Sequence, residues 1–573
     1  SLFGLKFNII NIIISTFIFG LGDDFSIFIL DGTLQEYKFR QKYLTSYKTA
    51  VLLSAITTII GMGVLIFAEH PALRSIAAIA IIGIVTVVII SYSIGPLLFN
   101  KLVYTKGKNR IVPITLRELI FSSIAFLIFV VGTLSLTVLG LTLLVTPLPR
   151  RFKSLFLHYC IMMQCRFLVY TMANVKKVKH NFTKDMFDKP AVIIYNHTSM
   201  VDILISLMLH PKTIILTTDW VQKNPVMGWL VKMADFYAVS EGADNTLEKL
   251  RIKVKEGYSI VIFPEGSRKT DGKIHKFHKG AFYLAQELGV DVLPIMLHGV
   301  NDIMNKHEQY LKSGRIDIKA LPRIVVGDNS FGDNYSEMAK LVRKHFAAEY
   351  EKFVESVKTP DYVASDVLKN YMFKSPFVEW YVRIKMFLAK NFVEFHKILP
   401  RSGTIIDLGC GYGYMDYILQ KASPDRIIIG VDYDEEKVRI AENCISKNDN
   451  ISFFHADVMQ FELVPCNAII IMDMLHYLPE HDHEPLLTRC FNSLLKGGIL
   501  IVRDGNEDNM KLQKSTVLTE KFSTGIGFNK TKGRLCFTSE TKMKAIAQKL
   551  GAHYECLNNA QITSNITYII RKD

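Results

Sequence analysis

Four long apolar stretches occupy the start of the chain, at about residues 7–30, 49–68, 74–100 and 119–148. Each approaches or exceeds the roughly 20 residues that an α-helix needs to cross a bilayer. This much contiguous apolar surface predicts a membrane-bound protein. The mean hydropathy of +0.20 and a charged fraction of only 21% agree with this prediction and exclude a disordered or fibrous chain.

Basic residues are concentrated beside these stretches. Residues 1–190 contain 20 Lys and Arg against 8 Asp and Glu, whereas the rest of the chain contains 48 against 46. The segments 31–48 and 101–117 are basic, and the segment 69–73 has no Lys or Arg. The positive-inside rule therefore places 31–48 and 101–117 in the cytoplasm and 69–73 outside. This distribution favours a membrane surface over a nucleic-acid partner.

The fourth apolar stretch is basic on both flanks, with Arg117 before it and Arg150 and Arg151 after it. A single crossing would place one flank on the wrong side of the membrane. We therefore expect a hairpin or a two-helix element in the interface, with its bend near Gly132 or Gly140. A plain crossing is the alternative.

Two carboxylates, Asp23 and Asp24, lie within the first stretch. An ionisable side chain at membrane depth indicates a functional site, unless it marks a helix end in the interface. The segments FGLGDDFSIFILDG and LLSAITTIIGMGVLIFAEHPALRSIAAIAIIGI resemble the last three membrane helices of the RND/MMPL exporters, over about residues 1–100. The resemblance makes Asp24 a possible proton-relay residue. It also implies a longer polypeptide whose N-terminal exporter portion is a partner of this chain, which alone should not transport anything.

Short β-rich runs begin near residue 190: AVIIYNH at 191–197, TIILTT at 213–218, SIVIFPEG at 259–266 and DVLPIML at 291–297. They predict buried strands that end in loops, as in an α/β layer fold with its site at the strand ends.

The first of these runs leads into NHTSMVD, which contains His197 and Asp202. A helix that starts just after the strand would bring the carboxylate to the imidazole. The carboxylate would hold one ring nitrogen and leave the other to accept a proton from a hydroxyl group. The alternative is a helix N-cap followed by a surface carboxylate. In a second motif, FPEGSR, Glu265 and Arg268 lie in a glycine-containing turn, where the guanidinium can bind a phosphate.

Four blocks, NHTSMVD, FPEGSR, KNPVMGWLVKMADFYAVS and LPIMLHG, resemble the PlsC-type (lysophosphatidate) glycerolipid acyltransferases over about residues 119–330. The resemblance implies that His197 is a general base, that Asp202 is its partner, and that the donor is an acyl thioester of coenzyme A or of an acyl carrier protein. The substrate-binding candidates are Asn196, Ser199, Glu265, Gly266, Ser267, Arg268 and Lys279. Ser240 and Glu241 stand where the family often has an arginine, which favours an acceptor other than simple lysophosphatidate. No metal site is expected.

Residues 335–400 predict helices that connect this region to the last one. Trp380, Ile384, Phe387 and Leu388 recur near helical spacing, and we expect them to pack against the protein rather than to bind a ligand.

The sequence TIIDLGCGYGYM (404–415) predicts a strand that ends in a glycine-rich turn. Further strands follow, and their ordered set resembles the class I S-adenosylmethionine-dependent methyltransferases over about residues 375–573. The resemblance assigns cofactor binding to Asp407, Gly409, Gly411, Gly413, Asp432 and Asp457. His476, Tyr477, Arg503 and Asp504 are further candidates for the methyl-transfer site, with structural roles as the alternative. A nicotinamide-binding Rossmann domain is the alternative fold.

These observations predict a multidomain membrane protein: transmembrane helices at 1–104, a PlsC-like α/β domain with membrane-associated helices at 115–355, and a Rossmann-like α/β methyltransferase at 362–573. The eight cysteines contain no CxxC pair, which indicates reduced thiols and cytoplasmic catalytic domains. The expected protein is a multi-pass enzyme of the bacterial inner membrane that acylates and methylates a lipid. A transporter with auxiliary soluble domains and a lipid-binding scaffold with degenerate motifs are the alternatives.

Overall fold

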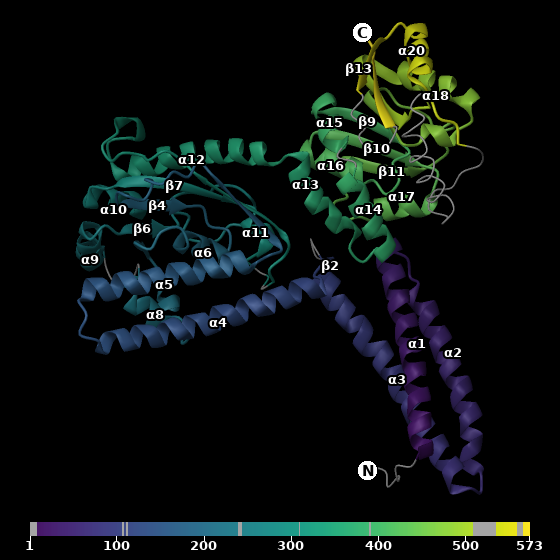
Figure 1. The fold of residues 1–573 in the computed structure, drawn as a ribbon, viewed down its shortest axis with the longest axis horizontal. Coiled ribbons are helices and arrows are strands. Elements are labelled where there is room, and N and C mark those ends of the chain that lie inside the picture. The colour runs from purple at the N-terminus through teal and green to yellow at the C-terminus, as the bar shows by residue number, and fades with distance from the viewer. Residues whose placement is uncertain are drawn as a thin grey trace. The chain divides into compact units, whose positions relative to one another are not determined.

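The computed structural model describes residues 9–105, 108–109, 113–238, 243–306, 308, 310–388, 391–507, 535–557 and 565–573. The chain divides into two compact units (Figure 1). The first unit comprises residues 1–113 and 358–573, and the second comprises residues 114–357. Ser240 and Glu241, which bear on the predicted acceptor, lie outside the described residues.

Three helices open the first unit: α1 (Ile9–Phe39), α2 (Leu44–Gly63), which continues as the 3-10 turn η1 (Val64–Phe67), and α3 (Pro71–Val103). Together with α4 (Leu116–Val145) of the second unit, they are long and apolar enough to cross a membrane, which indicates membrane association. The predicted loop at 31–48 is mostly helical. Since α1 extends to Phe39, only residues 40–43 connect it to α2.

The carboxyl end of α1 is bound by the C-terminal domain of the same unit. Lys374 is buried, and its ammonium donates hydrogen bonds to the carbonyls of Tyr37 (3.4 Å), Lys38 (3.3 Å) and Asn443 (2.9 Å). Lys38 also forms an ion pair with Glu436 at 2.5 Å. The last carbonyls of a helix lack intrahelical partners and carry partial negative charge, so a lysine is a suitable cap. These bonds fasten the C-terminal domain to α1.

Two long helices open the second unit, and the bend between them lies where two prolines occur. The helix α4 is continuous through Gly132 and Gly140, so the bend expected at these glycines is wrong. The chain turns at Pro147 and Pro149, before α5 (Arg150–Thr171). The glycines instead allow close packing: a Cβ atom at Gly132 would lie 2.3 Å from the Gln164 amide of α5.

The sheet of the second unit has six strands in the order β3-β8-β7-β4-β6-β5. Their bounds are β3 (Val175–His180), β4 (Ala191–Tyr195), β5 (Thr213–Ile215), β6 (Ser259–Ile262), β7 (Asp291–His298) and β8 (Gly314–Ala320). All pairs are parallel except β7 with β8. The helix α12 (Tyr335–Val357) covers one face, and α5 lies along the other with α4 beyond it (Figure 1). The fully buried strand β4 therefore delivers the residues that follow it to the middle of the domain.

The C-terminal domain has a seven-stranded sheet in the order β11-β10-β9-β12-β13-β15-β14. Its bounds are β9 (Gly403–Leu408), β10 (Arg426–Asp432), β11 (Ile451–His455), β12 (Cys466–Met472), β13 (Leu494–Gly505), β14 (His553–Leu557) and β15 (Asn565–Arg571). The first five strands are parallel, and β15 inserts antiparallel between β13 and β14. The nicotinamide-binding order lacks this insertion, so the alternative Rossmann assignment is disfavoured.

Helices cover both faces of this sheet. One core includes α13 (Pro360–Val367), α14 (Pro376–Leu388), α15 (Asn391–Ile398), α16 (Tyr414–Ala422) and α17 (Glu435–Glu442), and the other includes α18 (Glu480–Ser493) and α20 (Glu540–Lys549). The predicted packing role of Trp380, Ile384 and Phe387 is wrong, because all three side chains are exposed. The helix α14 buries another face instead, formed by Val378, Val382 and Met386. The side chain of Leu388, the fourth residue of this prediction, is not among those that the structure describes.

Candidate active sites

The second unit brings His197 and Asp202 together at the end of β4. Asp202 lies in the first turn of α6 (Val201–Leu207), after a loop of five residues that separates this helix from the strand. The His197 Nδ1 atom lies 3.0 Å from the Asp202 Oδ2 atom, which also accepts the backbone N–H groups of Thr198 (2.6 Å) and Ser199 (2.7 Å). An oxygen that accepts two N–H groups is an acceptor toward the ring as well. Nδ1 therefore carries the proton, and Nε2 is the basic nitrogen.

Three of the predicted substrate-binding residues form the buried frame of this site. The Asn196 side chain donates to the Leu297 carbonyl (2.9 Å) and accepts from the Leu297 N–H (2.8 Å), which ties the loop to β7. The Ser199 hydroxyl donates to the Met304 carbonyl at 2.7 Å. Glu265 accepts the N–H groups of His197 and His275, both at 3.2 Å. In the structure these side chains hold the two motif loops together.

The burial of Glu265 has an electrostatic consequence. Burial raises the pKa of this carboxyl, against the opposing effect of the two N–H groups that it accepts. The Glu265 side chain also holds two segments together, because one of its oxygens accepts the N–H of His197 and the other accepts the N–H of His275.

The remaining predicted residues divide between the cavity and the surface. Gly266, Ser267 and Arg268 line a cavity that also contains His197. Lys279 is exposed on the surface, and its ammonium lies 5.7 Å from the centroid of the Tyr335 ring. His278, which the motif analysis did not select, lines the cavity beside Gly266.

The cavity has a volume of about 860 Å³ and is mostly apolar. One part of its wall comes from α4 and α5, through Ala125, Phe129, Leu136 and Leu168. The polar residues His197 and Arg268 lie on the same cavity. The cavity therefore brings together a base, a cation that can bind a phosphate, and enough apolar volume for an alkyl chain.

In the C-terminal domain, the glycine-rich turn between β9 and α16 has the backbone that a closely bound ligand requires. Gly409, Gly411 and Gly413 have φ angles of +87°, +57° and +73°. At Gly413 a Cβ atom would also lie 2.5 Å from the Phe453 ring. A side chain is strained at these angles, so the turn depends on glycine.

Two acidic residues follow the neighbouring strands. Asp432, at the end of β10, accepts the N–H of Gly411 through Oδ2 and the N–H of Asp434 through Oδ1, both at 2.8 Å. Asp457, after β11, accepts the N–H of Met459 at 3.0 Å. Since β9, β10 and β11 are parallel, the structure brings the glycine turn and both carboxylates to one edge of the sheet. This edge suits a ligand with a positively charged group and ribose hydroxyls.

Beneath the glycine turn, Asp407 of β9 and Asp416 of α16 form a buried pair of carboxyl groups. Burial raises the pKa of Asp407 to about 7, and burial together with the charge of Asp407 raises the pKa of Asp416 well above its usual value. Two buried carboxyls in one site cannot both be ionised at neutral pH, so the folded pair keeps a proton there. Sequence analysis identified Asp407 but missed Asp416, whose place in α16 carries no motif.

We expect this pair to make the stability of the C-terminal domain fall as the pH rises from about 4 to about 7. In the unfolded chain these carboxyls ionise near pH 4, whereas in the folded domain the pair keeps its proton to about pH 7, so the unfolded state loses protons first. Asp416→Asn removes the shared acid and should raise the melting temperature more at about pH 8 than at about pH 5. Thermal unfolding of the full chain at both pH values measures this. An equal shift at both values would contradict the shared proton.

A second histidine–aspartate pair lies at the ends of β12 and β13. The His476 Nδ1 atom is 2.6 Å from the Asp504 Oδ1 atom, and the His476 N–H donates to Oδ2 at 2.9 Å. Both side chains are buried. Tyr477 contacts the His476 ring, with the centroids 4.2 Å apart, and Arg503 forms an ion pair with Asp473. The predicted set is therefore divided: His476 and Asp504 form a dyad, and Arg503 is occupied by another carboxylate.

The predicted proton-relay residue Asp24 is exposed on α1, as is Asp23. The neighbouring Phe25 and Ile29 point into the group formed with α2 and α3. Within these three helices, Asp24 therefore faces outward.

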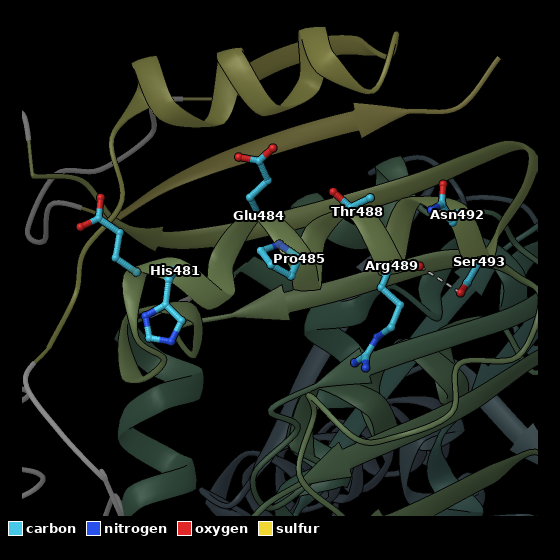
Figure 2. A pocket seen from close by; sticks show the side chains of 8 residues that line it. His481, Glu484, Pro485, Thr488, Arg489, Asn492 and Ser493 are labelled. Carbon is cyan, nitrogen blue, oxygen red and sulfur yellow. Dashed lines mark hydrogen bonds between the residues drawn. The ribbon is translucent and has the colours of Figure 1, made fainter.

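Another hollow lies along α18 (Figure 2). It is lined by charged and polar side chains, among them Glu484, Arg489 and Asn492. The Arg489 guanidinium donates to the carbonyls of Val458 and Met459, so it holds the loop after β11. We assign this surface no catalytic role.

Comparison with known proteins defines the class of each domain. Residues 166–298 match the family model described as "Acyltransferase", and residues 405–498 match the model described as "Methyltransferase domain". The chain is therefore an enzyme with an acyltransferase domain and a methyltransferase domain, in agreement with the predicted fold class. Residues 1–165 lie outside both matches, so the exporter resemblance stays a prediction.

The similar sequences are 1-acyl-sn-glycerol-3-phosphate acyltransferases. A chloroplastic enzyme of Brassica napus is 35% identical over 121 residues, which are 20% of this chain and 35% of the relative. An enzyme of Cocos nucifera is 27% identical over 210 residues, which are 35% of this chain and 66% of the relative. The chain thus spans about a third of the length of the first relative. The solved 1-acyl-sn-glycerophosphate acyltransferase of Thermotoga maritima is 20% identical, with a TM-score of 0.36 over 42% of this chain and 97% of that one.

Proposed function

We propose that the second unit transfers an acyl group from an acyl thioester, of coenzyme A or of an acyl carrier protein, to a hydroxyl group of a phosphoglycerol-like acceptor. The observation that carries this proposal is the His197–Asp202 pair on an apolar cavity that also contains Arg268. His197 Nε2 takes the proton of the acceptor hydroxyl, and the oxygen attacks the thioester carbonyl. Asp202 fixes the ring and stabilises the imidazolium that forms.

The phosphate of the acceptor is proposed to bind Arg268. Replacing Arg268 with alanine should raise the KM for lysophosphatidate by about 10- to 150-fold, since a charge-assisted hydrogen bond contributes about 1.5–3 kcal/mol. The same variant should leave the KM for monoacylglycerol, which has no phosphate, unchanged. The assay uses the purified full chain in lipid nanodiscs with a radiolabelled acyl thioester.

Lys273→Ala is the matched control for this assay, because Lys273 is an exposed cation on the same loop and does not line the cavity. It should leave both KM values unchanged. A wild-type enzyme that acylates lysophosphatidate and monoacylglycerol equally well would overturn the proposal that the acceptor carries a phosphate. Equal effects of both substitutions would show that net charge, rather than a specific contact, matters.

For the C-terminal domain we propose S-adenosylmethionine-dependent methylation of the same lipid or of a related molecule. The cofactor, when bound, supplies an electrophilic methyl group. The glycine turn at 409–413 admits it, and Asp432 and Asp457 hold the ribose and the adenine edge. Asp407 presents a buried carboxyl oxygen, Oδ1, without a hydrogen-bond partner, which suits a cationic ligand. His476, oriented by Asp504, is proposed to take a proton from the methyl acceptor.

For α1–α3 we propose a role as the membrane anchor of both enzyme domains, at the inner membrane of a bacterium with the catalytic domains in the cytoplasm. The basic segments beside the helices support this orientation. An exporter-like proton relay would require a partner for the outward-facing Asp24 from a segment beyond α1–α3, such as the predicted N-terminal exporter portion.

A further inference from the structure

One helix of the methyltransferase domain exposes a row of large apolar side chains. On α14, Trp380 is 63% exposed, Ile384 is 49% exposed and Phe387 is 77% exposed. Their spacing of four and three residues puts them on a single helix face. The opposite face packs into the core through Val378 and Val382. This packing fixes the orientation of the helix, so the apolar row stays on the outer face.

Exposed aromatic side chains in a row indicate an interaction surface. Trp and Phe are typical of helices that lie in the interface between a bilayer and water, where the indole ring has one apolar side and one polar N–H. The composition of this face therefore suits lipid.

The position of α14 in the first unit supports the same partner. Lys374, which caps the carboxyl end of α1, precedes the first residue of α14 by two positions. Its neighbour Phe373 packs against Phe99 of α3, with ring centroids 5.7 Å apart. The helix thus begins beside the ends of α1 and α3, the helices proposed to anchor the protein in the membrane.

The same helix also contacts the glycine-rich turn at 409–413, where S-adenosylmethionine is proposed to bind. The ring of Tyr381 lies 5.8 Å from the ring of Tyr412, which stands between Gly411 and Gly413. Lys385 pairs with Asp473, at the end of β12, at 3.6 Å. One face of α14 is therefore free to meet lipid while other residues of the same helix line the edge of the sheet where methyl transfer is proposed.

We propose that α14 is an interfacial helix that inserts Trp380, Ile384 and Phe387 into the membrane surface, and that the methyltransferase domain takes its methyl acceptor from the bilayer. The second half of this statement rests on the proposed methyltransferase function; the first half does not.

The fluorescence of Trp380 tests the membrane contact. The chain has three tryptophans, so Trp220→Phe with Trp229→Phe leaves Trp380 as the only one. The full-length variant is placed in phosphatidylcholine nanodiscs with and without brominated acyl chains, because bromine quenches a tryptophan that touches it. We expect quenching about twofold or more stronger than in a control with Trp380→Phe and Ile427→Trp, since interfacial tryptophans lie at the headgroup level. Ile427 is an exposed residue near the start of β10. It lies at the opposite end of this strand from Asp432 and the proposed cofactor site.

Two outcomes would overturn the membrane contact. Equal quenching in the Trp380 chain and in the control would show that α14 does not reach the lipid. Absence of bromine quenching combined with protection from acrylamide would show that another protein surface covers this face.

A second measurement separates the acceptor from the contact. Trp380→Glu with Phe387→Glu should leave the binding of labelled S-adenosylmethionine unchanged and should lower methyl transfer to the lipids of nanodiscs made from a total bacterial lipid extract by tenfold or more. If the wild-type chain binds the cofactor but methylates only soluble acceptors, the proposal that the methyl acceptor comes from the bilayer is overturned. Failure of the wild type to bind the cofactor would overturn the proposed function itself and leave the fluorescence result intact.

Discussion

His197→Ala is expected to lower kcat for acyl transfer by about 10²- to 10⁴-fold, the factor that a positioned general base contributes. The substitution removes the nitrogen that accepts the hydroxyl proton. It leaves the backbone bonds of the residue in place, namely the N–H to Glu265 and the carbonyl that accepts from Lys269. The loop should therefore keep its shape, and the KM for the acceptor should change little.

A matched control exists in the same domain. His180 lies 2.8 Å from the buried Asp317, and it does not line the cavity. His180→Ala should leave kcat unchanged, because Arg315 continues to pair with Asp317. The measurement is the rate of acyl transfer by each full-length variant under saturating donor, together with its melting temperature. A His197→Ala enzyme that retains the wild-type rate would remove His197 from the chemistry.

Asp432→Ala is expected to weaken binding of S-adenosylmethionine by about 10- to 150-fold, which corresponds to the loss of about 1.5–3 kcal/mol from hydrogen bonds to a charged acceptor. The carboxylate is proposed to bind the ribose hydroxyls, and it also accepts the Gly411 N–H, which holds the turn. Titration calorimetry of the full chain with the cofactor measures the loss. The demethylated product should lose affinity to the same degree, because it carries the same ribose.

The control for this effect is Asp434→Ala. Asp434 is two residues away and caps α17 by accepting the N–H groups of Glu436 and Lys437. Its loss should cost about 1 kcal/mol of stability, as for other N-caps, and should leave the cofactor affinity unchanged. Wild-type affinity in the Asp432 variant would show that the ribose binds elsewhere.

The two site motifs were predictable because each is local in sequence. His197 and Asp202 are five residues apart, so a strand and a helix start suffice to bring them together. The glycine turn and Asp432 follow successive parallel strands, whose carboxyl ends share one edge. The family matches confirm the two enzyme classes that these motifs indicated.

Other features depend on contacts that a linear pattern does not encode. FPEGSR indicates a loop at a strand end but not which way Glu265 points, and its carboxylate binds two backbone N–H groups inside the protein. Apolar spacing on α14 is present on two faces, so the pattern does not tell which face packs. The glycines of α4 do not mark a bend, because they allow contacts with side chains distant in sequence, Gln164 at Gly132 and Met233 at Gly140. The prolines at 147 and 149 were the better signal.

The bonds from Lys374 to the last turn of α1 have a kinetic consequence. A domain fastened to the proposed membrane anchor would diffuse with it and search for its acceptor in two dimensions. For an acceptor that resides in the bilayer, the encounter rate then follows the mole fraction of that lipid in the membrane rather than its amount per volume of solution. Diluting the acceptor with inert lipid would slow such an enzyme, whereas diluting the whole suspension with buffer would not.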